Sequence, residues 1–146
     1  MPRPGPKAVR AALREHARPD KAEGMRAYLK SELPCLGVQV PVARRLAKTL
    51  FGTAPCDDLS TLSKLVEQLW FAAEFREERF VALNILRLKP HRALLTAKAA
   101  PLLETLIRSG AWWDLVDELS AHVVGVMLEN DPKAMAKVLR TALGKA

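Results

Sequence analysis

The sequence predicts an all-α protein, and three observations support this fold class. Of its 146 residues, 49% are hydrophobic, which is enough for one buried core, while only 5% are aromatic and alanine and leucine dominate. Apolar residues recur three and four positions apart along most of the chain, which is the spacing of one helix face. Proline and glycine interrupt this spacing often, so the helices are short and closely connected.

Residues 1–6 are predicted to be a flexible N-terminus, because three prolines and a glycine there cannot continue a helix. A single domain, 7–146, is predicted to follow. About eight helices of 10–16 residues are expected in it, over residues 7–18, 20–33, 41–51, 59–70, 73–88, 98–109, 112–129 and 132–143.

Proline, glycine and capping residues set the predicted helix boundaries. Pro19 ends the first helix, and Asp20 can cap the second. Pro34 and Gly37 end the second helix, and Pro41 suits the first turn of the third. The later boundaries are expected at Gly52, Asp57 or Asp58, Pro90, Ser109–Gly110 and Asp131–Pro132.

The fourth predicted helix has a clear apolar stripe, which Trp70 completes, so Trp70 is expected to pack in the core. Short links make consecutive helices antiparallel pairs. Such pairs either stack into an α-solenoid or close into a bundle, and no strict sequence repeat decides between the two.

The net charge is +7 and the pI about 9.8. Residues 1–50 hold eleven Lys and Arg against four Asp and Glu, a balance of +7, and residues 51–146 hold twelve of each, so they balance at zero. All the excess charge therefore lies in the first third. This distribution favours a polyanionic partner such as nucleic acid, and a basic but solvated surface is the alternative.

Several classes of protein are excluded by the sequence. Cys35 and Cys56 are too few for a disulfide scaffold and are expected to be reduced thiols. The three histidines have no ligand-like spacing, so neither a metal nor another cofactor is expected. The basic start lacks a signal-peptide core, and no apolar run approaches a membrane span, so a cytoplasmic location is expected.

Several stretches resemble a known family in their order and spacing. They are Tyr28–Pro41 with Arg44 and Arg45, Trp70 with 74–79, Ser109–Asp117, Ala121–Gly125 and Asp131–Pro132. Over about residues 22–143 the chain resembles the DNA alkylation repair enzyme family, in particular the HEAT-like DNA glycosylases of the AlkD type. The Trp–Trp–Asp–x–Val–Asp run is the most specific part, because paired tryptophans and two spaced aspartates rarely coincide by chance.

The resemblance implies a HEAT-like α-solenoid whose concave basic face binds double-stranded DNA. It also implies hydrolysis of the N-glycosidic bond of cationic alkylated purines, such as 3-methyladenine and 7-methylguanine. In this interpretation Asp117 is the catalytic carboxylate and Trp113 the aromatic wall beside the lesion. Tyr28 and Gln39 would line the same cleft. Trp112 is a third substrate-binding candidate, although it is expected to face inward.

The residues support part of this interpretation without the family. Trp113 and Asp117 are four positions apart, so on a helix they share one face. A cationic alkylpurine is already a good leaving group, so no strong general acid is needed. A carboxylate stabilises the oxocarbenium-like sugar and orients water, and an indole adds cation–π attraction.

Other interpretations of the same residues stay open. Asp114 fits the first turn of a helix, where carboxylates complement the helix dipole, and Asp117 could pair with Arg108. Tyr28 could lie at the edge of the core. A non-catalytic helical-repeat module that binds nucleic acid or a protein is the alternative function.

Basic side chains near the start of the third predicted helix are candidates for phosphate contacts. The DNA-binding candidates are Lys30, Arg44, Arg45 and Lys48. The alternative is a solvated basic face. Arg76 and Arg79, which alternate with glutamates over residues 74–79, are expected to form local ion pairs instead.

Family members continue through several more helices, which carry a further tryptophan and an Arg-rich segment. Since this chain ends at Ala146, we expect the far wall of the cleft to be missing or to be supplied by another chain. An exposed last helix would favour a homodimer or a second subunit that covers it.

Overall fold

The computed structural model describes residues 3–110 and 120–144, and every regular element in these ranges is helical, which confirms the all-α prediction. The elements are α1 (Pro6–Arg14), α2 (Pro19–Leu29), α3 (Val40–Phe51), α4 (Leu59–Phe71), α5 (Arg76–Leu86), η1 (Lys89–Leu94), η2 (Ala97–Ala99), α6 (Ala100–Gly110), η3 (Ser120–Val124), α8 (Gly125–Asn130) and α9 (Pro132–Gly144). Of these, η1 and η2 are 3-10 helices and η3 is a π-helical turn. None of the described helices combines the length and apolar character that crossing a membrane requires.

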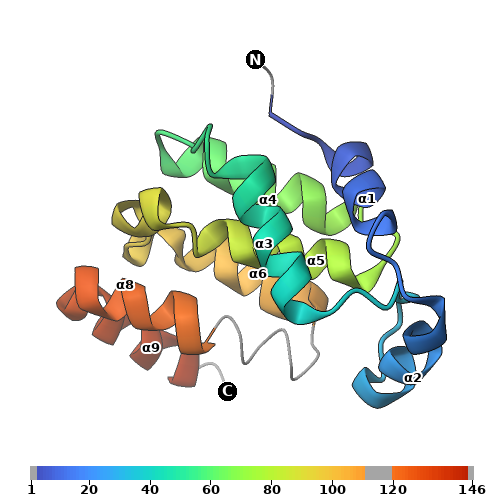
Figure 1. Cartoon of the computed structure of the whole chain (residues 1–146). Helices are drawn as coiled ribbons and strands as arrows, with labels where there is room; N and C mark the ends of the chain where they lie inside the picture. Colours follow the sequence, from blue (N-terminus) through green and yellow to red (C-terminus); the bar gives the residue numbers. More distant parts are fainter. Residues whose placement is uncertain (1–2, 111–119, 145–146) are drawn as a thin grey trace.

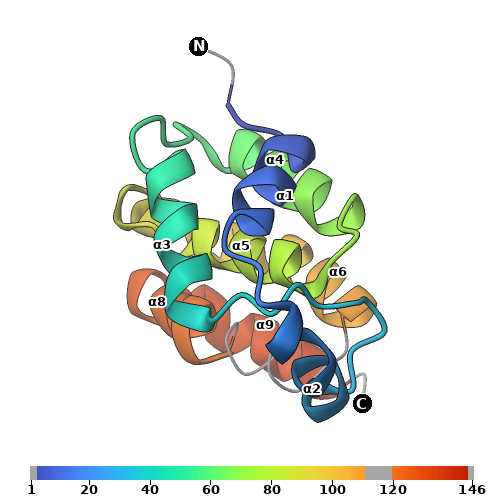
Figure 2. The ribbon, with the colours of Figure 1, turned by 45° about the vertical axis from the view of Figure 1, so that its right-hand side comes forward.

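Helix α5 is the centre of the fold. It packs against α1, α3 and α4, and ten of its eleven residues are buried, so it is enclosed on nearly all sides (Figure 1; Figure 2). The sequence predicted one apolar side for this helix. The structure buries more because three helices surround α5, and its charged residues Glu77 and Glu78 find partners inside.

The second part of the core forms between α6, α8 and α9. Helix α4 also contacts α6, and α8 packs on α9 (Figure 1). Leu106, Met127 and Met135 are buried in this part and are continuous with the hydrophobic core around α5. The core is therefore one connected cluster. The HEAT-like solenoid predicted for these helix pairs stays a prediction.

Capping interactions explain where the predicted boundaries were right and where they were wrong. Asp58, one of two predicted caps, begins α4: its Oδ1 accepts the Thr61 N–H at 2.7 Å, and this hydrogen bond lowers the pKa of Asp58. Helix α5 begins at Arg76, three residues later than predicted, because the Glu78 carboxylate accepts the N–H groups of Glu74 and Phe75 at 2.8 Å.

The buried imidazole of His91 joins two loops. Its Nε2 accepts the Cys56 N–H at 2.9 Å, which requires the proton on Nδ1, and Nδ1 then donates to the Ile85 carbonyl at 2.8 Å. Both ring nitrogens are thus satisfied by the backbone. His91 is a structural residue that fixes the α3–α4 connection to the end of α5.

The connection between α2 and α3 has no helix or strand and is fixed at several points. The Arg18 N–H donates to the Leu36 carbonyl at 2.9 Å, and the Arg76 N–H donates to the Pro34 carbonyl at 3.0 Å. Gly37 has a φ of +86°, and a Cβ built there would collide with the Arg18 carbonyl oxygen. Glycine is required at this position both by conformation and by space.

We predict opposite effects of the same substitution at two glycines. Gly37→Ala should lower the free energy of unfolding by about 1–3 kcal/mol, because alanine is strained at this φ and its methyl group has no room. Gly24→Ala, inside α2 with open space around it, should instead raise stability by about 0.5–1 kcal/mol. Urea unfolding followed by circular dichroism measures both. A Gly37→Ala variant as stable as wild type would contradict this account of the connection.

Candidate functional site

The central candidates of the sequence analysis, Asp117, Trp113 and Trp112, lie outside the described residues. Their roles stay predictions. Helix α6 ends at Gly110, just before them, and η3 begins at Ser120, just after them. The remaining candidates are on α2, on the α2–α3 connection and on α3.

Tyr28 and Lys30 lie at the end of α2. This helix has no buried residue and stands at the lower right of the molecule in Figure 1. Tyr28 is 74% exposed, so its ring is not at the edge of the core, which was the structural alternative for it. Lys30 ends the helix in a left-handed conformation with φ 52° and is exposed. Both side chains are accessible to a ligand.

Gln39 is the N-cap residue of α3. Its carbonyl accepts the N–H groups of Val42 and Ala43, both at 3.0 Å, but its side chain makes no capping hydrogen bond. The residue is exposed, whereas Val38 before it is buried. The backbone of Gln39 is therefore held by hydrogen bonds within α3, whereas its side-chain amide does not cap the helix.

A buried carboxylate holds the backbone just before Gln39. The Glu77 side chain on α5, 1% exposed as a residue, accepts three consecutive backbone N–H groups at 2.8–3.1 Å, from Leu36, Gly37 and Val38. Three donors on one carboxylate compensate the loss of hydration that burial imposes on the charge. The start of α3 is thereby attached to the central helix.

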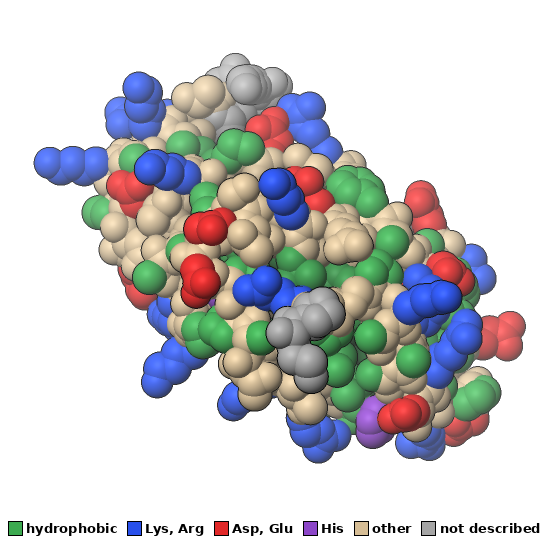
Figure 3. Space-filling view, turned by 90° about the horizontal axis from the view of Figure 1, so that it is seen from above, with side chains coloured by type: hydrophobic (Ala, Val, Ile, Leu, Met, Phe, Trp, Pro, Cys, Tyr) green, Lys and Arg blue, Asp and Glu red, His purple; other side chains and the backbone are tan. Residues whose placement is uncertain are grey.

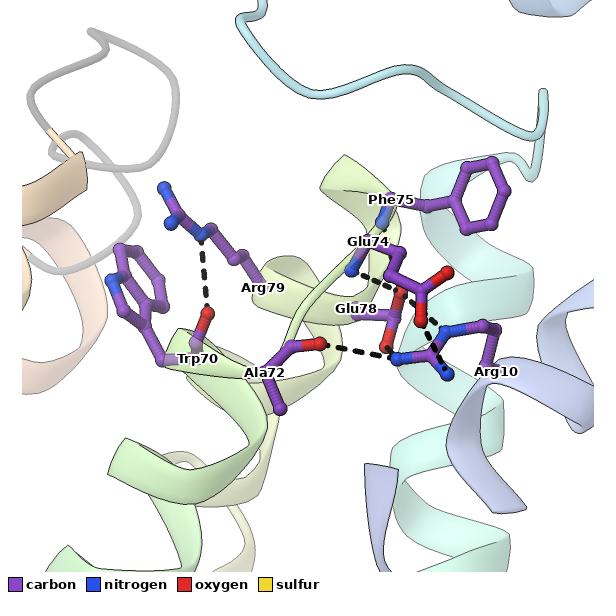
Figure 4. A network of polar contacts seen from close by, with 7 residues as sticks. All are labelled: Arg10, Trp70, Ala72, Glu74, Phe75, Glu78 and Arg79. Atoms are coloured by element: carbon purple, nitrogen blue, oxygen red, sulfur yellow. Dashed lines mark hydrogen bonds and ion pairs between the residues drawn. The ribbon is translucent and has the colours of Figure 1, made fainter. Parts of the chain in front are cut away.

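A second, partly buried network attaches α1 to the start of α5 (Figure 4). Arg10 pairs with Glu78 at 3.1 Å and with Glu74 at 2.9 Å, and it donates to the Ala72 carbonyl at 3.1 Å. Only 13% of the Arg10 side chain is exposed. Arg10 contributes to the basic charge of the first third, but its guanidinium pairs with groups of the protein and is not a free surface charge.

The basic candidates on α3 divide into two kinds. Arg44 donates through Nε to the Oδ1 of buried Asn84 at 3.2 Å, and the Asn84 amide donates to the Phe80 carbonyl at 2.9 Å. Arg45 and Lys48 are exposed, and neither forms an ion pair with any described residue. Arg45 and Lys48 are therefore the α3 cations most available to a phosphate.

Basic side chains are spread widely on the face seen in Figure 3. Lys and Arg stand at many separate places around its outline, with carboxylates between them and apolar atoms in the middle. The excess charge of the sequence thus does not gather into one patch on this face.

The cysteine in the α2–α3 connection is chemically quiet. Burial raises the pKa of the Cys35 thiol to about 11, and the Glu77 carboxylate adds to this effect. Burial also raises the pKa of Cys56. Both cysteines are free thiols, and neither is a thiolate nucleophile near neutral pH.

Trp70 is fully buried, as predicted, and its indole N–H donates to Ser109 Oγ at 2.8 Å. The Arg79 guanidinium lies 4.9 Å above its ring, and Arg79 Nε donates to the Trp70 carbonyl at 3.3 Å. The ion pair with a neighbouring glutamate that was predicted for Arg79 does not form among the described residues. Glu77 and Glu78 face inward to other partners, which explains the difference.

Two hollows were not foreseen from the sequence. An apolar groove of about 630 Å³ lies between α6, α8 and α9 and is lined by Leu103, Ile107, Met127, Met135, Val138 and Leu139. A polar pocket of about 280 Å³ is lined mainly by Arg87, Arg92, His122 and Glu129. Each is lined by residues from separate elements of the chain, so no local sequence pattern indicates it.

The comparison with protein families identifies this chain. The family model of the DNA alkylation repair enzyme matches residues 9–142, which is most of the chain. No curated protein is significantly similar in sequence. The chain belongs to the DNA alkylation repair enzyme family, and its role is in DNA repair, with DNA as the substrate that this family indicates.

We predict that Glu77→Gln destabilises the protein by about 2–3 kcal/mol, because a neutral amide loses charge-assisted hydrogen bonds and turns an NH₂ group toward backbone donors. Glu23→Gln, an exposed change on α2, is the matched control and should alter stability by less than about 0.5 kcal/mol. Denaturant midpoints of the two variants measure the difference. Equal midpoints would mean that the carboxylate does not hold the connection.

Proposed function

We propose that this chain hydrolyses the N-glycosidic bond of cationic alkylated purines, such as 3-methyladenine and 7-methylguanine, in duplex DNA. The observation that carries the proposal is the extent of the family match. It runs over residues 9–142 and so includes the run 112–117, which holds Trp113 and Asp117 four positions apart.

Hydrolysis of this N-glycosidic bond requires little more from the protein than one carboxylate and an aromatic surface. The alkylated base leaves as a neutral purine, so the developing positive charge is on the sugar. Asp117 would stabilise that charge and orient the attacking water, and Trp113 would lie against the cationic base. No cofactor takes part in this proposal.

Tyr28 and Gln39 would complete the cleft. Both are exposed, and Gln39 is held by the α3 backbone, whose position Glu77 fixes. A side-chain amide on a fixed backbone can contact the edge of a base or a sugar with little loss of entropy on binding. Trp112 would support the cleft from within.

Binding to the DNA backbone would come from a basic face of a HEAT-like solenoid. Lys30, Arg45 and Lys48 are exposed and form no ion pair with a described residue, and Arg44 is oriented by Asn84. Phosphate contacts of this kind add affinity without reading sequence. Such contacts suit an enzyme that must search any sequence for a lesion.

Asp117→Asn should lower the release of 7-methylguanine from methylated duplex DNA about 10²-fold or more, because the amide cannot stabilise the sugar cation. Chromatography of the released base measures the rate. Asp114→Asn is the control in the same segment and should keep most of the activity. An Asp117→Asn variant as active as wild type would remove this residue from the mechanism.

Removal of a cation that binds a DNA phosphate should make DNA binding less sensitive to salt. For Arg45→Gln and Lys48→Gln, the slope of log affinity against log salt should become shallower by about 0.9 for each variant. Fluorescence anisotropy with a labelled duplex gives the slopes. Lys98→Gln is the control, since Lys98 is an exposed lysine on η2 and not one of the DNA-binding candidates (Figure 1; Figure 2). Slopes equal to wild type would move the DNA away from α3.

A non-catalytic module that binds a partner is the second candidate, and the apolar groove between α6, α8 and α9 favours it. A second copy or another subunit that covers this groove would bury Ile107 and Leu139, which are partly exposed. Analytical ultracentrifugation tests for a homodimer. Salt-sensitive DNA binding without any base release would favour the module over the glycosylase.

A further inference from the structure

The geometry points to a phosphate-binding site centred on Arg79, which recognises one phosphodiester of duplex DNA through the terminal nitrogens of its guanidinium. This inference rests on the proposed function, because it takes DNA as the ligand. It adds a residue from α5, whereas the basic candidates from the sequence are on α3 and at the end of α2.

The carboxylates next to Arg79 in the sequence already have other partners. Glu77 accepts three backbone N–H groups of the α2–α3 connection, and Glu78 holds Arg10 and the start of α5. Within the part of the chain that the structure describes, no carboxylate pairs with Arg79. The positive charge of Arg79 is therefore not neutralised by the acids beside it in sequence.

The guanidinium of Arg79 is already oriented by two contacts with Trp70. It stacks on Trp70, and its Nε is used by the Trp70 carbonyl. Trp70 is itself held by Ser109, whose hydroxyl donates to the Thr105 carbonyl at 2.8 Å. An arginine fixed by stacking and by one hydrogen bond loses little further entropy when an anion binds.

The remaining donors of Arg79 are the two terminal nitrogens of its guanidinium. In Figure 4 the two terminal nitrogens of Arg79 point away from the Trp70 carbonyl and from the cluster of Arg10, Glu74 and Glu78. Two terminal nitrogens of one planar group can donate in parallel to two oxygens of a phosphate. Arg79 is also the one residue of α5 that is not fully buried, so part of its side chain is exposed.

The electrostatic surroundings are consistent with such a site. Partial burial lowers the pKa of Arg79, and the Glu32 carboxylate opposes this shift. A partly desolvated cation attracts an anion more strongly than one in bulk water. Glu32 is exposed and forms no ion pair with Arg79, so it weakens the attraction for phosphate without occupying the donors.

The test compares Arg79→Met, Arg79→Lys and wild type in the full chain. Met keeps an apolar contact with Trp70, and Arg140→Met on α9 is the matched control, because Arg140 is exposed and donates to its own helix. Anisotropy with a labelled duplex is measured over a range of KCl concentrations. Arg79→Met should bind about 10-fold more weakly, with a salt slope shallower by about 0.9. Arg79→Lys should keep the slope and lose part of the affinity.

A second readout separates a phosphate contact from a structural role. The Arg79 Nε–H signal in a ¹⁵N-edited spectrum, assigned by its loss in Arg79→Met, should shift on addition of duplex. An unchanged slope in Arg79→Met, or a signal that does not move, would overturn the site even if the variant is less stable. A wild-type chain that binds DNA with this dependence but releases no base would contradict the glycosylase and leave the site intact. A wild-type chain that binds no duplex would overturn both.

Discussion

The arrangement of the candidate site depends on the hydrogen bonds that the buried Glu77 carboxylate accepts from the backbone. A charge buried this deeply costs several kcal/mol unless hydrogen bonds compensate it. The three N–H groups that compensate it come from consecutive residues of the α2–α3 connection. Because removing any donor leaves a buried charge short of partners, the connection cannot slide along α5. Gln39 and the first turn of α3 follow this connection directly in the chain, so their backbone is held in place as well.

The fold class and several helix ends could be predicted from the sequence, because they depend on local chemistry. Asp58 caps α4 and Pro132 begins α9 because each acts within a few residues of itself. Glu77 was not predicted, since it lies among charged neighbours and its partners are backbone groups about 40 residues earlier. Such donors carry no side-chain signature. The predicted roles of Asp117 and Trp113 rest on the spacing of these residues and on the family, not on observed geometry.

The basic charge of the first third has two uses that composition cannot separate. Arg3 donates to the carbonyls of Ala54 and Pro55, and Arg10 enters the buried network with Glu78. These arginines neutralise or satisfy groups of the fold. Arg45 and Lys48 form no ion pair with a described residue, so their charge is available to a ligand. A net charge of +7 therefore overstates the basic surface that DNA can meet.

The same distinction applies within four residues of α5. Glu77 and Glu78 turn inward because unsatisfied backbone N–H groups and the Arg10 guanidinium are there to be compensated. Both acids are committed, no carboxylate of the described residues forms an ion pair with Arg79, and its guanidinium stacks on Trp70. A cationic side chain can bind a ligand when the carboxylates near it in the sequence already pair with other groups of the fold. The acids that stabilise the centre of this protein thus also determine which of its cations can meet a phosphate.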